Sequence, residues 1–174
     1  MQRLNRTLVS IAVILLVLIV SVGAIIALFI NQSQPSTFSS FSLNAQGNAY
    51  DMTQNKSVFF YLTLAGNANG NIEKTIDLQI KSGNVNVAGY PYIAVASGES
   101  TLTPNSPNIE LHLLVTATGY GLSPTSWTLQ GTIGNISGNN ANASVVLSAQ
   151  QLSLPLENSP TLTNVTVSGT TALK

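Results

Sequence analysis

The chain has 174 residues, with six basic and six acidic side chains, one histidine and no cysteine. Charged residues make up 7% of it, against roughly 25% in a typical soluble domain, while Asn, Ser and Thr together account for 55 positions. So few basic residues exclude a surface built for the phosphate backbone of nucleic acids. The lack of cysteine excludes disulfides, thiolate metal sites and a cysteine nucleophile.

The N-terminal part of the sequence predicts a membrane anchor. Residues 8–30 carry no charge, and 23 residues of helix, at about 1.5 Å each, would span a hydrocarbon core of ~30 Å. Two arginines lie within residues 1–7, and the next basic residue is Lys56. The positive-inside rule therefore predicts a cytoplasmic N-terminus and an extracytoplasmic remainder. The alternative is cleavage as a secretory signal, although the stretch exceeds the usual 7–15-residue h-region and no A-x-A-like site follows it.

The rest of the chain predicts a polar linker at residues 31–40 and one domain at residues 41–174. Apolar and polar residues alternate in this domain, which is typical of half-buried strands. The clearest strands cover residues 58–64, 72–80, 108–118 and 127–133, and shorter candidates cover residues 38–50, 85–96, 143–149 and 162–167. Turn-forming residues at 67–71, 82–84, 104–107 and 137–140 are expected to separate strands, and the glycines are interpreted as turn residues. We therefore predict an all-β fold, an antiparallel, Ig-like β-sandwich of about eight strands.

Few residues suggest catalysis or metal binding. Glu110 and His112, two residues apart on a predicted strand, could supply two zinc ligands, but such a site needs three or four. The six acidic residues are scattered singly, and no G-x-S-x-G, G-x-G-x-x-G or Walker A sequence occurs. We therefore expect neither an enzyme nor a cofactor or metal site.

Asn-x-Ser/Thr sequons mark candidate sites of glycosylation. One of the six, at Asn5, lies on the predicted cytoplasmic side. An extracytoplasmic address would expose the other five to the modifying enzyme. These candidates are Asn31, Asn55, Asn135, Asn142 and Asn164.

Four aromatic residues are candidates for binding a partner. Phe59 and Tyr61 alternate with the inward row of their strand, so they are expected to point outward, and we place Tyr90 and Tyr92 in the same set. Such rings could stack on sugars or fill a protein interface. The alternative is that neighbouring structure covers them.

The layout resembles two groups of proteins. One is the LEA14-like (water-stress and hypersensitive response) group, which it resembles in having an anchor followed by a strand-rich domain. The matching stretch is residues 58–98, with the turn at 67–71 and then Val85-Asn86-Val87 and Ala96-Ser97-Gly98. A strand at 102–115 would follow it. The chain is also similar to archaeal surface-filament subunits, the pilins and the accessory proteins of the archaellum, which join an N-terminal hydrophobic helix to a Thr/Ser/Asn-rich β-sandwich. Arg6-Thr7-Leu8 lacks the Gly or Ala that precedes the cut in pilins. Neither resemblance implies catalytic residues.

The functional expectation is a non-catalytic, membrane-anchored protein of the cell surface with a structural, adhesive or filament-associated role. A surface layer, a filament or a second copy of the chain are the expected partners. A surface with few ionisable groups also suits an acidic exterior, such as that around thermoacidophilic archaea. The alternatives are a LEA14-like stress-protective protein, a virion membrane protein and, last, an enzyme.

Overall fold

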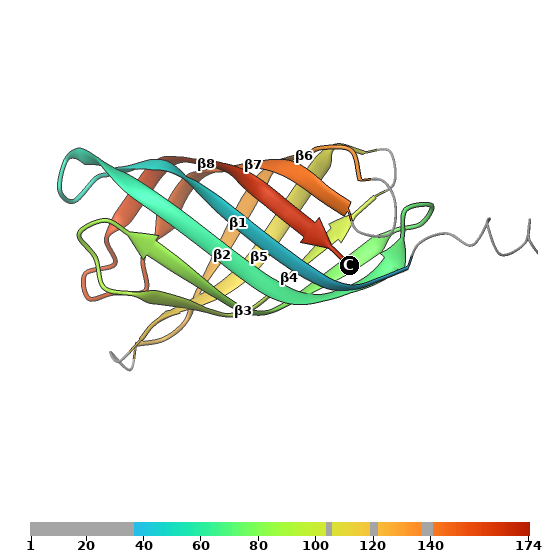
Figure 1. Cartoon of the computed structure of the whole chain (residues 1–174). Coiled ribbons are helices and arrows are strands. Elements are labelled where there is room, and N and C mark those ends of the chain that lie inside the picture. Colours follow the sequence, from blue (N-terminus) through green and yellow to red (C-terminus); the bar gives the residue numbers. More distant parts are fainter. Residues whose placement is uncertain (1–36, 104–105, 119–121, 137–140) are drawn as a thin grey trace, which may run out of the picture. The chain divides into compact units, whose positions relative to one another are not determined.

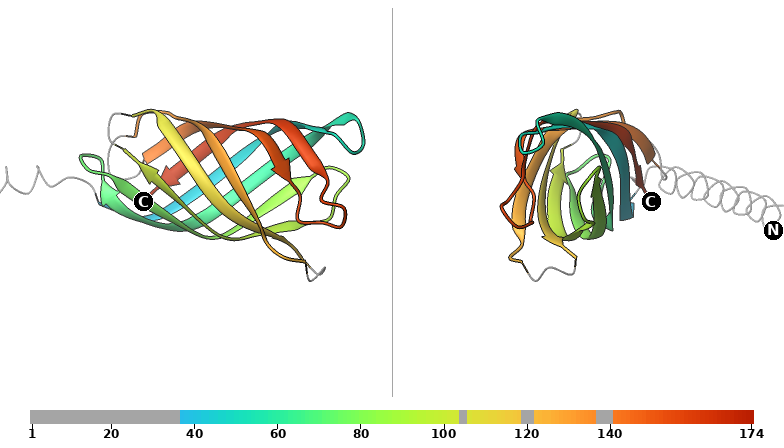
Figure 2. Two further views of the ribbon diagram at one scale, coloured as in Figure 1. Left: turned by 180° about the vertical axis from the view of Figure 1, so that it is seen from behind. Right: turned by 90° about the vertical axis from the view of Figure 1, so that its left-hand side faces the viewer.

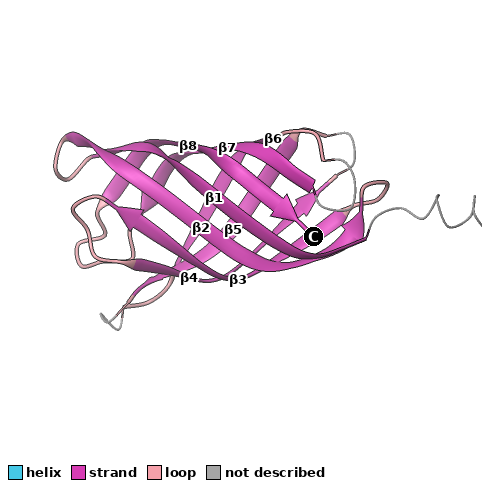
Figure 3. Ribbon diagram, viewed as in Figure 1, coloured by secondary structure: helices cyan, strands magenta, loops and turns pink. Residues whose placement is uncertain are grey.

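A computed structural model describes residues 37–103, 106–118, 122–136 and 141–174. They form eight strands and no helix (Figure 3): β1 (Thr37–Asp51), β2 (Lys56–Asn71), β3 (Ile76–Val87), β4 (Ile93–Leu102), β5 (Asn108–Ala117), β6 (Thr125–Ile133), β7 (Ala141–Ser153) and β8 (Thr161–Leu173). In this part of the chain no helix has the length and hydrophobicity needed to cross a membrane. The predicted anchor at residues 8–30 lies outside the described residues.

The strands form a closed barrel in which each strand pairs with its neighbours in the sequence (Figure 1). Every pairing is antiparallel, and β1 pairs with β8 as well as with β2, from Phe41 opposite Leu173 to Asp51 opposite Leu162. Seen end-on, the strands surround a common interior (Figure 2). The predicted all-β, antiparallel fold of about eight strands is confirmed, but the sandwich is replaced by a barrel because the first and last strands join.

The interior of the barrel is filled by the apolar rows that alternation predicted. The even-numbered residues from Val58 to Leu64 in β2 and the odd-numbered residues from Ile109 to Ala117 in β5 are all buried. Phe60 and Trp127 meet inside, with ring centroids 6.1 Å apart. The outward positions between these rows are mostly polar. An eight-stranded barrel is just wide enough for its side chains to fill, which matches this packed core.

Several predicted strand boundaries are wrong. Residues 67–71 belong to β2 and residues 82–84 to β3, and the chain turns instead at residues 72–75. The predicted strand at 85–96 is the end of β3, a connection at residues 88–92 and the start of β4. Asn and Gly in a strand do not force a turn when the neighbouring strands supply the hydrogen bonds.

The predicted linker at residues 31–40 is also too long at its C-terminal end. Residues 37–40 already belong to β1. Phe38 is buried in the core, and the backbone N–H groups of Ser39 and Ser40 donate to the carbonyl oxygen of Lys174 at 2.7 and 3.0 Å. Residues 37–40 therefore belong to a strand in spite of their polar side chains, because their backbone is hydrogen-bonded at the end of β8.

At four glycines inside strands, an added Cβ atom would lie within 2.0 Å of a backbone carbonyl oxygen of a neighbouring strand. At Gly131 in β6, a Cβ atom would overlap the carbonyl oxygen of Val146 in β7. The interpretation of the glycines as turn residues is therefore wrong at these positions. Without a side chain, these glycines allow neighbouring strands to approach closely and to coil as strongly as a closed barrel requires. The four are Gly47, Gly66, Gly131 and Gly169.

The two ends of the barrel differ. The far end carries the β1–β2, β3–β4, β5–β6 and β7–β8 connections, and in the last of these Leu154, Pro155, Leu156 and Pro160 are buried. The near end carries the other three connections, the start of β1 and the end of β8 (Figure 1). We use the terms far end and near end in this sense below.

We expect Gly131→Ala to destabilise the barrel by about 1–3 kcal/mol, because the added methyl group forces β6 and β7 apart. Urea unfolding followed by circular dichroism measures this loss. The matched control is Thr132→Ala, which changes the adjacent, exposed residue and should cost less than about 1 kcal/mol. Equal stability of the two variants would contradict the close approach at Gly131.

Candidate functional sites

Three aromatic residues lie along the outer face of β1 and β2, and we call them the aromatic strip: Tyr50, Phe59 and Tyr61. Phe59 is 48% exposed and Tyr50 36%, while Tyr61 is half-buried. Phe59 pairs with Asn48, and Tyr50 pairs with Ser57. Tyr50 and Phe59 are therefore diagonal neighbours on the outer face, within reach of one another. The strip forms an apolar surface on a wall that is rich in Asn, Ser and Thr.

Tyr50 is a member of this strip that the sequence analysis missed. The alternation of the predicted strand at residues 38–50 could have indicated it. Ala45 and Ala49 of this strand are buried, so Tyr50, the next residue, lies on the opposite, outer face. What the sequence lacked was the register of β1 against β2. That register alone brings Tyr50 beside Phe59.

The two other predicted aromatic residues lie in the β3–β4 connection at the far end. Tyr92 is 49% exposed, and its carbonyl oxygen accepts a hydrogen bond from the N–H of Thr118 at 3.3 Å. Tyr90 is half-buried, and its hydroxyl donates to Oδ2 of Asp51 at 2.5 Å. Tyr90 therefore contributes to the structure of the far end, whereas the ring of Tyr92 is open to solvent.

Asp51 is a fully buried carboxylate at the end of β1. Its Oδ1 accepts hydrogen bonds from the backbone N–H groups of Thr53 at 2.8 Å and Gln54 at 3.0 Å, and its Oδ2 accepts from Tyr90. Asp51 thus fixes the β1–β2 turn and ties it to the β3–β4 connection. Three hydrogen bonds to one carboxylate compensate the cost of burying it.

The pKa of Asp51 lies below its ordinary value. Burial acts to raise this pKa, but the hydrogen bonds from Tyr90, Gln54 and Thr53, together with the nearby charge of Lys56, lower it by more. The pKa of the Tyr90 hydroxyl is raised, first by burial and then by its hydrogen bond to Asp51. Both shifts keep Asp51 ionised and Tyr90 protonated at neutral pH.

His112 and Glu110 lie on the outer face of β5, as predicted from their spacing. Nε2 of His112 is 3.4 Å from Oε1 of Glu110, and Nδ1 is 3.3 Å from Oγ1 of Thr128. Glu99 of β4 stands opposite His112 in the register. Among the described residues, however, no three His, Cys, Asp or Glu side chains are grouped so as to hold a metal ion.

The sequons of the described residues are all exposed. Asn55 lies in the β1–β2 turn at a φ of 51°, and its Oδ1 accepts a hydrogen bond from the hydroxyl of Tyr50. Asn142 and Asn164 face outward on β7 and β8, and Asn135 follows β6 at the near end. Asn31 lies outside the described residues. Exposure is necessary for glycosylation, and these four side chains meet that condition.

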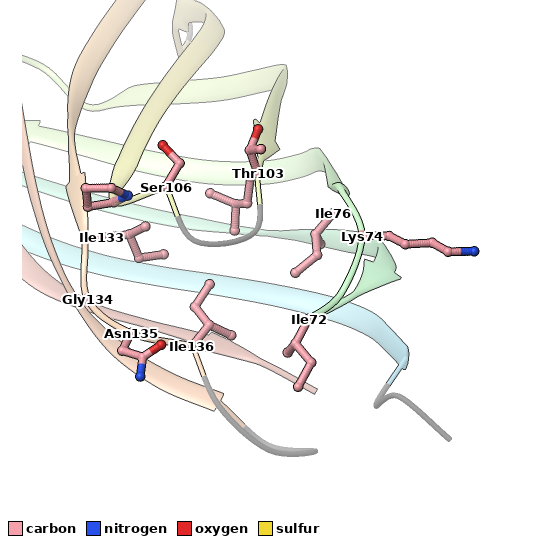
Figure 4. Close-up of a pocket in the computed structure, with 11 residues that line it drawn as sticks. Ile72, Lys74, Ile76, Thr103, Ser106, Ile133, Gly134, Asn135 and Ile136 are labelled. Carbon is pink, nitrogen blue, oxygen red and sulfur yellow. The ribbon is translucent and has the colours of Figure 1, made fainter. Parts of the chain in front are cut away.

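A cavity of about 270 Å³ lies at the near end, between the β2–β3 hairpin, the β4–β5 connection and the residues that follow β6 (Figure 4). Ile76, Leu102 and Ile133 form its buried floor. Ile72 and Ile136 are half-buried at its side and pack against the core. The sequence does not indicate this site, because its residues are far apart in the chain and meet only where three connections converge.

Comparison with known proteins yields no match: no family model, curated protein or solved structure is significantly similar to this chain. The two resemblances noted in the sequence therefore stay hypotheses.

We expect Asp51→Asn to lower the free energy of unfolding at neutral pH by about 1–3 kcal/mol, and with it the unfolding temperature. The reason is that the hydrogen bonds to Asp51 are assisted by its charge and are weaker to a neutral amide. A carboxyl with a lowered folded pKa stabilises fully above its unfolded pKa of about 3.9, and this contribution is lost as the pH falls through the folded pKa. The difference between wild type and variant should therefore be constant from pH 7 to about pH 5 and shrink below about pH 4. Thermal unfolding at a series of pH values measures it.

The control for this experiment is Asp77→Asn, which alters an exposed aspartate on the outer face of β3. It should change the free energy of unfolding at neutral pH by less than about 0.5 kcal/mol. A difference between wild type and Asp51→Asn that does not shrink in acid would show that the charge of Asp51 does not stabilise the far end.

Proposed function

We propose that the chain is a non-catalytic, membrane-anchored protein of the cell surface whose extracytoplasmic barrel makes a structural or adhesive contact. The aromatic strip carries the proposal. Tyr50 and Phe59 are exposed side by side on a wall rich in Asn, Ser and Thr. Exposed aromatic side chains are enriched where proteins meet other proteins or sugars, because each ring contributes a large apolar area with few rotatable bonds.

The charge pattern and the sequons support the same proposal. A wall of amides and hydroxyls has few groups that titrate, so its charge changes little when the exterior becomes acidic. Four sequon asparagines on the outside of the barrel are open to modification. A contact through aromatic rings also depends less on salt and pH than one through ion pairs.

The anchor proposal predicts the side of the membrane on which the barrel lies. Because the chain has no cysteine, a single introduced cysteine is the only site for a maleimide label. Ser126→Cys, at an exposed position on β6, should react with a membrane-impermeant maleimide on intact cells. Gln2→Cys, the control before the anchor, should react only after permeabilisation. The reverse pattern would contradict the proposed orientation, and recovery of the barrel in the medium would mean that the anchor is cleaved.

The adhesive role is tested on the aromatic strip. In cells that display the full chain, Phe59→Ser combined with Tyr61→Ser should reduce attachment to neighbouring cells or to isolated cell envelopes several-fold. The unfolding temperature should change little, because neither ring belongs to the buried core. Attachment counted under flow is the measurement.

The matched control for the strip is Val146→Ser, because Val146 is 45% exposed on the outer face of β7. This variant should attach like wild type. Equal losses in both variants, or attachment no greater than in cells without the chain, would contradict an adhesive role for the strip.

A further inference from the structure

Five of the eleven described residues that line the near-end cavity are isoleucine or leucine. Figure 4 shows Ile76, Ile133 and Ile136 directed into a common space, while Lys74 extends away from it. Among the described residues that line the cavity there is no aromatic ring, and Lys74 is the one that carries a charge. These isoleucine and leucine side chains can contact hydrocarbon, as the apolar walls of ligand pockets generally do.

Of the polar residues at the cavity, Ser106 takes part in the local turn and Asn135 is exposed. The Oγ atom of Ser106 accepts a hydrogen bond from the N–H of Asn108 at 3.3 Å, and the N–H of Ser106 donates to the carbonyl oxygen of Thr103 at 3.1 Å. Asn135 is exposed at the rim. A polar ligand would therefore find few free partners on the cavity floor.

The size of the cavity limits the ligand to a small apolar group. Its volume of about 270 Å³ lies just below the ~300 Å³ at which sites for drug-sized molecules begin. It can take the end of one hydrocarbon chain but not a whole lipid. Ile72 and Ile136, which are only half-buried, would be covered further by such an occupant.

The length of the chain before β1 places a source of hydrocarbon near this end of the barrel. Six residues, 31–36, separate the proposed anchor from Thr37, where β1 begins at the near end. Fully extended, six residues reach roughly 20 Å at about 3.3–3.6 Å each. An anchored barrel therefore keeps its near end within reach of the lipid surface.

We propose that the near-end cavity binds the hydrocarbon chain of a membrane lipid. This inference rests on the proposed anchor, since the anchor brings the cavity to the bilayer. The occupant docks the near end onto the membrane and so holds the aromatic strip at a fixed orientation above it.

The test uses the full chain reconstituted in phosphatidylcholine vesicles that contain a phosphatidylcholine with a diazirine at the end of one acyl chain. After illumination, peptide mapping locates the cross-links. We expect cross-links both within residues 8–30 and on residues that line the cavity, in particular Ile72, Ile133 and Ile136.

Two variants alter the cavity in different ways. Ile72→Ser makes its wall more polar, and Ile136→Trp fills its space without shortening a core side chain. Each should reduce cross-linking at the cavity by about tenfold, because several apolar contacts to the chain are lost. Val146→Ser, on the outer face of β7, should leave it unchanged. Circular dichroism of each reconstituted variant confirms that the barrel is folded.

The outcomes separate this inference from the proposed anchor. Cross-links in residues 8–30 without cross-links at the cavity would overturn the inference and leave the anchor standing. Cross-links at the cavity alone would support the lipid site and overturn the anchor. Cross-links at neither place would overturn both. Cavity cross-links that persist unchanged in both folded variants would also overturn the inference, because the lipid would then not enter the cavity.

Discussion

The ladder between β1 and β8 is the interaction on which the rest of the structure depends. It joins strands more than 100 residues apart and removes the two free edges that an open sheet would present. A side chain strengthens it, since Oγ1 of Thr171 donates to the carbonyl oxygen of Ser42 at 2.9 Å. Because the sheet closes on itself, every apolar row faces one enclosed core, and no second layer is needed to cover it.

Closure also determines where function can reside. The interior is packed with side chains, so binding surfaces remain only on the outer wall and at the two ends. At the far end, Leu154 and Leu156 of the β7–β8 connection are buried, and the hydrogen bond from Tyr90 to Asp51 ties two other connections together. The near end keeps an apolar hollow where three connections meet. The barrel is thus chemically different at its two ends, although all its strands follow one simple alternating pattern.

The proposals assign separate roles to these surfaces. The aromatic strip would contact a partner through apolar rings, and the near-end cavity would contact lipid through aliphatic side chains. Glycines with no room for a side chain, such as Gly131, allow the strands to coil around the core. The outer wall is then free to carry the polar residues and sequons typical of an exposed protein.

The sequence by itself determined the all-β class, the antiparallel strands and the inward rows, because alternation depends only on which face of a strand is buried. It also identified Phe59 and Tyr61 as outward and placed Glu110 beside His112, since both pairs follow from local spacing. Only the tertiary structure decided that the sheet is a barrel, because a sandwich strand and a barrel strand have the same pattern and differ only in long-range pairing. For the same reason, the register that adds Tyr50 to the strip, the hydrogen bond from Tyr90 to Asp51 and the near-end cavity all depended on contacts between distant segments.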